Sequence, residues 1–421
     1  MTRARVPAVG GERSVPEPDA VARDYLLLAL RLDQHAPGLI DAYFGPAELK
    51  ARAELEPLPS PERLADDAAE LRSRVPQEVA EHDRAAWLER QLMALETRAR
   101  VAAGAPLGYR QRIRAALDDE PADTPEEAWV EMRDGLEQLV PGRGPLRRRL
   151  AEWDARWIVA PGRLGAALEA ALPWIRDTVA GAIGEAALPD GETVESHVVT
   201  GARSAGAAEF LGGLRTRIDI SADLPRQLPE LVDTLAHETY AGHHLDYAAR
   251  ETERVEGRGW VEATIVLIGT PEEYLSEGLA VAGTQMLLPP DLLADAYRHI
   301  AGAAGLAGVG TDAETAAQVQ CLRERGIAAG ADAALRIHEA GASPDEVVRW
   351  LVDEICLDPE RARARTRTAG TFGTALFGYA GGARLVQAWS GLDGRTLAVP
   401  RFRRLLGATT TPSLLRADLP G

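Results

Sequence analysis

The sequence predicts a mainly α-helical protein with one small β region. Over most of the 421 residues, apolar side chains recur three and four positions apart, the spacing that gathers them on one face of a helix. Proline and glycine separate these segments, as is typical of helix boundaries. β-Branched residues cluster in a single stretch, between Glu192 and Ser221. A chain of this length can bury a substantial core.

The first part of the chain is predicted to be helical throughout. Residues 1–17 contain arginines but no apolar core, and we expect them to be disordered. Residues 18–190 form a helical N-terminal half that flanks or roofs a cleft. Its helical segments are expected near residues 18–35, 61–75, 78–103, 125–139, 144–158 and 163–187.

Residues 191–421 are predicted to form the catalytic half, continuous with the first half as one structural unit. The segment 216–220 (TRIDI) alternates polar and apolar residues, which predicts a strand. One helix is expected to begin at about Leu228 and another after Thr270 and Pro271. Further helices are expected to run to about Leu406.

The composition limits the partners and the location. A net charge of −17 argues against nucleic acid and anionic membranes as partners, because both would repel the chain. The two cysteines, Cys321 and Cys356, are too few for a disulfide framework and are expected to be reduced thiols. The apolar run at residues 26–30 is too short for a signal peptide or a membrane span. We therefore expect a cytoplasmic protein; nothing in the sequence specifies its oligomeric state.

Other common catalytic devices are missing from the sequence. Lys50 is the only lysine, and its charged neighbours do not provide the apolar setting that would favour a Schiff base. The glycine-rich residues 301–310 lack the G-K-[ST] of a phosphate loop, and no G-x-S-x-G motif is present. No organic cofactor is therefore predicted.

The window from His237 to His244 (HETYAGHH) holds three of the eight histidines of the chain. Imidazole nitrogens suit zinc, and Glu238 follows the first histidine, where zinc hydrolases keep the base that activates metal-bound water. This density of metal-ligating residues predicts a zinc site.

The spacing in this window does not suit a straight helix. Residues six apart, such as His237 and His243, lie about 9 Å apart along a helix axis and about 120° around it. Zinc–nitrogen bonds of about 2 Å cannot bridge that separation. The helix is therefore predicted to be interrupted between Tyr240 and His243, with Gly242 tolerating the unusual backbone. We take His243 as the second ligand and keep His244 as the alternative.

The window resembles the H-E-x-x-P-G-H-H signature of a bacterial domain-of-unknown-function family placed among the gluzincin zinc peptidases. Residues 25–49, 216–235, 274–280 (YLSEGLA) and 377–389 are also similar to that family, so the resemblance extends over most of the chain. The proline of the signature is Ala241 here.

The resemblance implies a gluzincin-like architecture and a third metal ligand from a downstream helix. Glu277 matches the family's glutamate, and Glu272 and Glu273 are the alternatives. The resemblance also implies that Tyr379 stabilises the oxyanion of the reaction and that the strand at 216–220 is an edge that holds extended substrate.

These features predict a zinc metallopeptidase in which His237, His243 and Glu277 bind zinc and Glu238 assists attack by zinc-bound water on a short peptide. A carboxypeptidase or a dipeptidase would fit. The alternatives are a zinc hydrolase of a non-peptide amide or ester, and an inactive metal-binding scaffold protein. An iron enzyme would accept the same ligands, but Glu238 favours hydrolysis.

Overall fold

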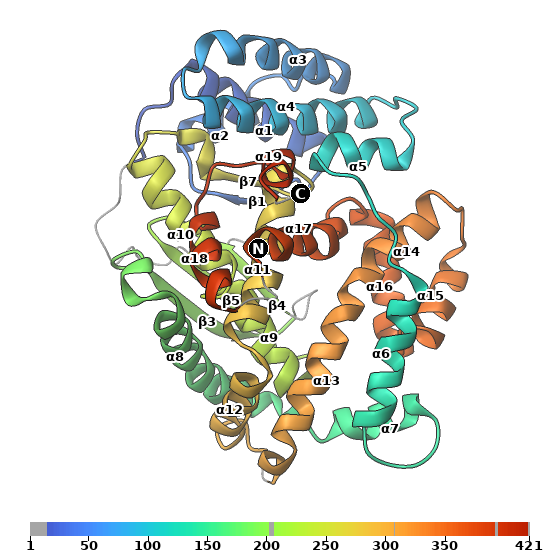
Figure 1. Ribbon diagram of the computed structural model, residues 1–421. Helices are drawn as coiled ribbons and strands as arrows, with labels where there is room; N and C mark the ends of the chain where they lie inside the picture. Colours follow the sequence, from blue (N-terminus) through green and yellow to red (C-terminus); the bar gives the residue numbers. More distant parts are fainter. Residues whose placement is uncertain (1–14, 202–205, 307, 392–394, 420–421) are drawn as a thin grey trace.

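The computed structural model of the protein describes residues 15–201, 206–306, 308–391 and 395–419. In these ranges helices dominate, with three small β-sheets between them (Figure 1), which confirms the predicted fold class. The part of the expected disordered terminus at residues 1–14 lies outside the described residues.

The N-terminal helices form a layer at the top of Figure 1. Asp19 caps the first of them, because its carboxylate accepts a hydrogen bond from the Ala22 amide (2.8 Å), and Ser60 caps the third. Leu26, Leu64 and Leu88 are fully buried in the core of this layer. The helices are α1 (Ala20–His35), α2 (Ala47–Leu55), α3 (Pro61–Glu78), α4 (His82–Ala102) and α5 (Tyr109–Leu117).

Three more helices lead to the sheets, namely α6 (Glu126–Leu139), α7 (Leu146–Ala155) and α8 (Leu164–Ile183). Their apolar faces join a core cluster that also contains residues of the second half of the chain. Ile175 of α8, for example, belongs to the same cluster as Leu231 and Leu279. Packing therefore crosses the boundary at residues 190 and 191.

The predicted β region forms a three-stranded sheet of β3 (Thr193–Val199), β4 (Gly206–Phe210) and β5 (Arg215–Ser221). The strand order is β3-β5-β4, with β3 parallel and β4 antiparallel to β5. The expectation that residues 216–220 form an edge is wrong, because β5 is paired on both sides and β4 takes the edge. Two short antiparallel pairs were not predicted: β1 (Ile40–Tyr43) with β7 (Ile265–Leu267), and β2 (Ile158–Val159) with β6 (Arg226–Gln227).

The second half is built around α9 (Leu228–Glu238), α10 (His243–Arg250) and the central helix α11 (Pro271–Leu287). Thr270 caps α11 as the sequence indicates. The remaining helices, lower and to the right of α11 in Figure 1 or packed on it, are α12 (Pro290–Ala301), α13 (Ala313–Arg325), α14 (Ala329–His338), α15 (Pro344–Asp353), α16 (Pro359–Phe372), α17 (Ala383–Ser390), α18 (Arg395–Leu405) and α19 (Pro412–Ala417).

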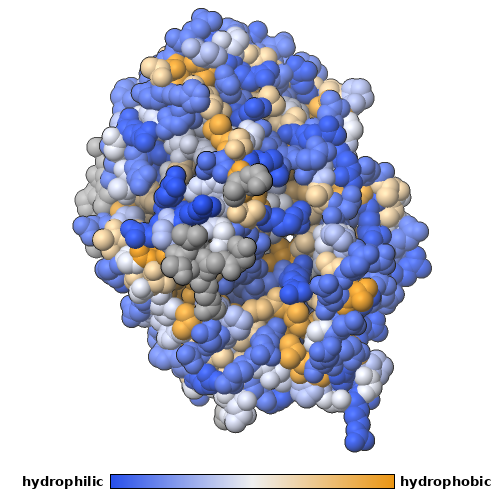
Figure 2. Space-filling view, in the orientation of Figure 1, coloured by the Kyte–Doolittle hydropathy of each residue, from blue (hydrophilic) through white to orange (hydrophobic). Residues whose placement is uncertain are grey.

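The face shown in Figure 2 is mostly hydrophilic, and its hydrophobic residues form a few small patches. Within the described ranges, no helix has both the length and the apolar character needed to cross a bilayer.

Candidate metal centre

The helix that the sequence predicts to carry metal ligands is interrupted at the expected place. Helix α9 ends at Glu238 and α10 begins at His243, with an irregular turn between them. In this turn the Ala241 amide bonds the Ala236 carbonyl at 3.2 Å, five residues back, in place of the regular i to i−4 bond. The interruption brings the His237 and His243 rings to a centroid distance of 4.8 Å.

A glycine is required at position 242. A Cβ added there would lie 2.7 Å from the Ala280 Cβ on α11 and closer still to the His237 carbonyl oxygen. The turn is therefore pressed directly against the helix that carries Glu277.

His237, His243 and Glu277 meet in one cluster. The Oε2 atom of Glu277 lies 3.3 Å from Nε2 of His237 and 3.6 Å from Nε2 of His243. One ligand atom from each residue lies within 4.8 Å of the others. Glu277 is 8% exposed, and its Oε2 atom has no hydrogen-bond partner among the described residues. A buried oxygen without a partner between two imidazole nitrogens fits a zinc ion in donor type and number.

The charges of the cluster support the same interpretation. Burial tends to raise the pKa of Glu277, but the neighbouring His243 and His237 outweigh it and hold this pKa below its usual range. Burial tends to lower the pKa of His243, but the charges of Glu277, Glu238 and Asp41 raise it to about 10. The metal-free cluster therefore holds a proton that a divalent cation would displace.

The other candidate ligands are engaged by other partners. Both ring nitrogens of His244 are engaged, Nδ1 with the Thr216 hydroxyl at 2.9 Å and Nε2 with the Glu192 carboxylate at 3.1 Å. Glu272 forms ion pairs with Arg254 and Arg250. Glu273 accepts a hydrogen bond from the Gly269 amide at the start of α11.

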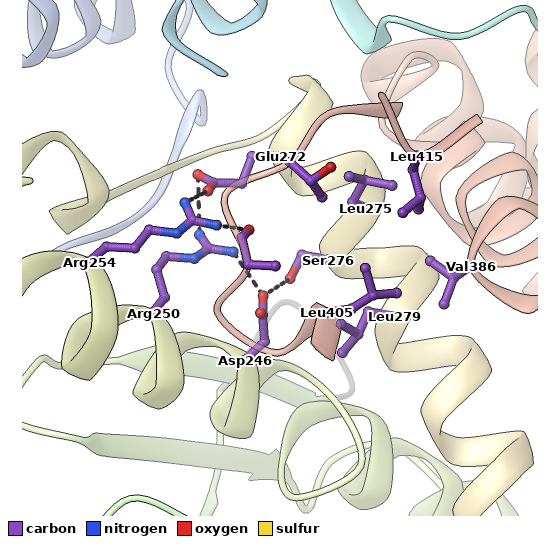
Figure 3. Close-up of a pocket in the computed structure, with 12 residues that line it drawn as sticks. Asp246, Arg250, Arg254, Glu272, Leu275, Ser276, Leu279, Val386, Leu405 and Leu415 are labelled. Carbon is purple, nitrogen blue, oxygen red and sulfur yellow. Dashed lines mark hydrogen bonds and ion pairs between the residues drawn. The ribbon is translucent and has the colours of Figure 1, made fainter. Parts of the chain in front are cut away.

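A buried polar network of Ser276, Asp246, Arg250 and Glu272, drawn in Figure 3, adjoins His243. Nδ1 of His243 lies 3.2 Å from the Ser276 hydroxyl, and this hydroxyl donates to Asp246 Oδ2 at 3.1 Å. Arg250 donates to the same carboxylate and pairs with Glu272. With Ser276 accepting from Nδ1–H, Nε2 of His243 is free to face Glu277. Neither Ser276 nor Asp246 was predicted from the sequence, although Asp246 lies three residues after His243.

The cluster opens into a cavity of about 350 Å³. Glu238, His243, Glu277 and Tyr379 line it, together with residues of α16, the strands β1, β4 and β5 and the segment that follows β7. Tyr379 lies in the π-helical turn η7 (Gly378–Gly382), and its ring stacks on His237 at a centroid distance of 5.9 Å. This turn packs tightly on α11, because a Cβ at Gly278 would collide with the backbone of Gly382.

Comparisons with known proteins locate the fold. No protein-family model matches the chain, and no curated protein matches its sequence. A solved structure of a candidate lipoprotein from Colwellia psychrerythraea has a TM-score of 0.52 and 12% identity, and the match covers 86% of this chain and 66% of that one. A candidate lipoprotein of unknown function from Shewanella oneidensis has a TM-score of 0.50 and 11% identity, with 94% and 82% covered.

Trypanosoma cruzi metallocarboxypeptidase 1 aligns with a TM-score of 0.49 and 11% identity, over 95% of this chain and 96% of that one. At identities of 12% and 11%, the likeness to the two candidate lipoproteins concerns the fold alone. The chemistry of this chain therefore has to be argued from its own residues.

Proposed function

We propose that this protein is a zinc-dependent peptidase that hydrolyses short peptides. The observation that carries the proposal is the convergence of His237, His243 and Glu277 beside Glu238, whose carboxylate lines the same cavity as His243 and Glu277. Two imidazoles and one carboxylate are a ligand set that leaves a fourth position on zinc open. When bound, zinc supplies a Lewis acid that polarises a carbonyl group and lowers the pKa of water.

The residues of the chain supply the remaining chemistry. Glu238 provides a carboxylate that accepts a proton from water inside the cavity. Tyr379 provides a hydrogen-bond donor: burial and the charges of Glu277, Glu273 and Glu238 raise the pKa of its hydroxyl well above the usual value. The hydroxyl therefore keeps its proton at neutral pH and can donate to an oxygen that gains negative charge.

The cavity suits a small substrate. Its volume of about 350 Å³ lies in the range of small-molecule sites, about 300–1,000 Å³. Phe210, Ile268 and Leu376 give part of its wall an apolar surface for substrate side chains. These properties favour a short peptide over a folded protein.

The test begins with the zinc content of protein purified without added metal, which should be about one ion per chain. Hydrolysis is then followed on short peptides and on matching esters. Glu238→Gln should keep the zinc and lose about 10²–10⁴ in rate, because the amide cannot accept the proton. Glu169→Gln on the exposed face of α8 is the matched control.

Full activity of Glu238→Gln on a peptide cleaved by the zinc form would exclude Glu238 as the base. Hydrolysis of esters but of no peptide would assign the site to the non-peptide alternative. If the purified protein contains no zinc and does not bind added zinc, the proposal of a metal centre is wrong.

A further inference from the structure

We infer that Asp41 recognises a positively charged nitrogen of the substrate, so that the site selects peptides bearing an ammonium group beside the cleaved bond. This inference rests on the proposed function and deepens it. Asp41 lines the cavity, and the zinc chemistry assigns it no part. In the described structure its carboxylate forms no hydrogen bond or salt bridge.

A β-bulge places Asp41 at the cavity. Strand β1 pairs with β7 through Ile40 opposite Leu267 and Ala42 opposite Val266, and the register shifts between these two pairs, where Asp41 stands. A bulge leaves one residue out of the ladder and redirects its side chain, and bulges are frequent beside active sites. Here the flanking Ala42 is buried, while Asp41 is exposed and lines the cavity.

Asp41 has no partner of its own in the described part of the chain, where no hydrogen bond or salt bridge reaches its carboxylate. Although solvent reaches the residue, partial desolvation by the cavity walls, with the charges of Glu277, Glu238 and Glu209, raises its pKa to about 6 against the lowering effect of His243. Its carboxylate is therefore charged at neutral pH and lies near the metal cluster. Binding of a cation to a carboxylate in such a position is energetically favourable.

Apart from the metal cluster itself, the described lining of the cavity offers an anion no cationic side chain. Among the described residues that line it there is no lysine or arginine. Arg217, on the neighbouring strand β5, is held by Glu209 at 2.7 Å and by Asp219 at 3.4 Å. A site that binds the carboxylate end of a peptide normally uses an arginine or lysine. The charge of this cavity therefore favours the amino end of a peptide or a basic side chain.

The roles of the other carboxylates leave Asp41 for the substrate. Glu277 belongs to the metal cluster, and Glu238 serves as the base. Glu273 is occupied by the Gly269 amide, and burial raises its pKa well above the usual value, so that it tends to be neutral. Asp41 is then the cavity carboxylate available for an ionic contact with substrate.

Three peptides with one backbone test the inference and separate the two sources of the charge. Ala-norleucine-Ala carries only an α-ammonium group, acetyl-Ala-Lys-Ala carries only a side-chain ammonium group, and acetyl-Ala-norleucine-Ala carries neither. Their binding to metal-free protein is measured by calorimetry, and kcat/KM is measured with zinc. Wild-type protein should prefer at least one charged peptide over the neutral one by about 10- to 100-fold, as expected for a hydrogen bond to a charged group.

Asp41→Asn should remove that preference and leave zinc content and binding of the neutral peptide unchanged, because the isosteric amide loses only the charge. Asp41→Lys should reverse it. Glu48→Gln, which changes an exposed carboxylate on α2 outside the cavity, should keep the wild-type preference.

An undiminished preference in Asp41→Asn would overturn the inference, and so would a wild-type protein that binds the three peptides equally. A failure of the proposed function is a different outcome, in which zinc-loaded wild-type protein cleaves no peptide. The binding arm still decides the role of Asp41 in that case.

Discussion

Replacement of Gly242 by alanine tests how the proposed metal centre is built. The added Cβ would lie 2.7 Å from the Ala280 Cβ, whereas ordinary contact begins at 3.4 Å, so the turn and α11 must separate by about 0.7 Å (3.4 − 2.7). The collision with the His237 carbonyl oxygen is more severe and involves the backbone of a proposed ligand. The change therefore pushes His237 and His243 away from Glu277 on α11.

Gly242→Ala should lower both the stability of the protein and its affinity for zinc, and the size of each effect can be worked out. Overpacking of a close contact costs about 1–3 kcal/mol in the free energy of unfolding. A metal site tolerates ligand displacements of only about 0.2 Å, so a shift of about 0.7 Å should weaken zinc binding by about tenfold or more. Urea unfolding of metal-free protein measures the first effect, and competition with a zinc chelator measures the second.

Gly181→Ala is the control, because no described atom lies within 4 Å of a Cβ at this position in α8. It should leave zinc affinity unchanged and stabilise the protein by about 0.5–1 kcal/mol, since alanine favours a helix. The reasoning is refuted if Gly242→Ala matches the wild-type protein in both stability and zinc affinity.

Two further substitutions examine residues around the cluster. Ser276→Ala removes the hydroxyl between His243 and Asp246 and should weaken zinc affinity by about 10- to 100-fold. Ser390→Ala, which removes a buried helical hydroxyl bonded to a carbonyl one turn back, should leave the affinity unchanged, and equal affinities of the two variants would exclude the orienting role. Tyr379→Phe should lower kcat by about 10²-fold with little change in KM, as expected for an oxyanion donor. A higher KM at constant kcat would instead make the Tyr379 hydroxyl a substrate-binding group.

Features that depend on residues close together in the sequence could be predicted from it. Helical periodicity predicted the main helices, because the helix repeat is set by the backbone and the apolar face by local spacing. The interruption before His243 could be predicted for the same reason: the rise per residue of a helix is constant, and two ligands six residues apart exceed the reach of one ion. The edge at residues 216–220 was predicted wrongly, since alternation indicates a strand but not its neighbours.

Tertiary structure alone decided which side chains meet. His243 and His244 are adjacent, and only packing against Thr216 and Glu192 turns His244 away from Glu277. The same holds for Asp41, which reaches the cavity through a bulge in a strand paired with residues more than 220 positions later. Sequence determines which residue types are available and which local backbone shapes they permit. The contacts between distant segments follow from how buried surfaces fit together, and no local pattern encodes that fit.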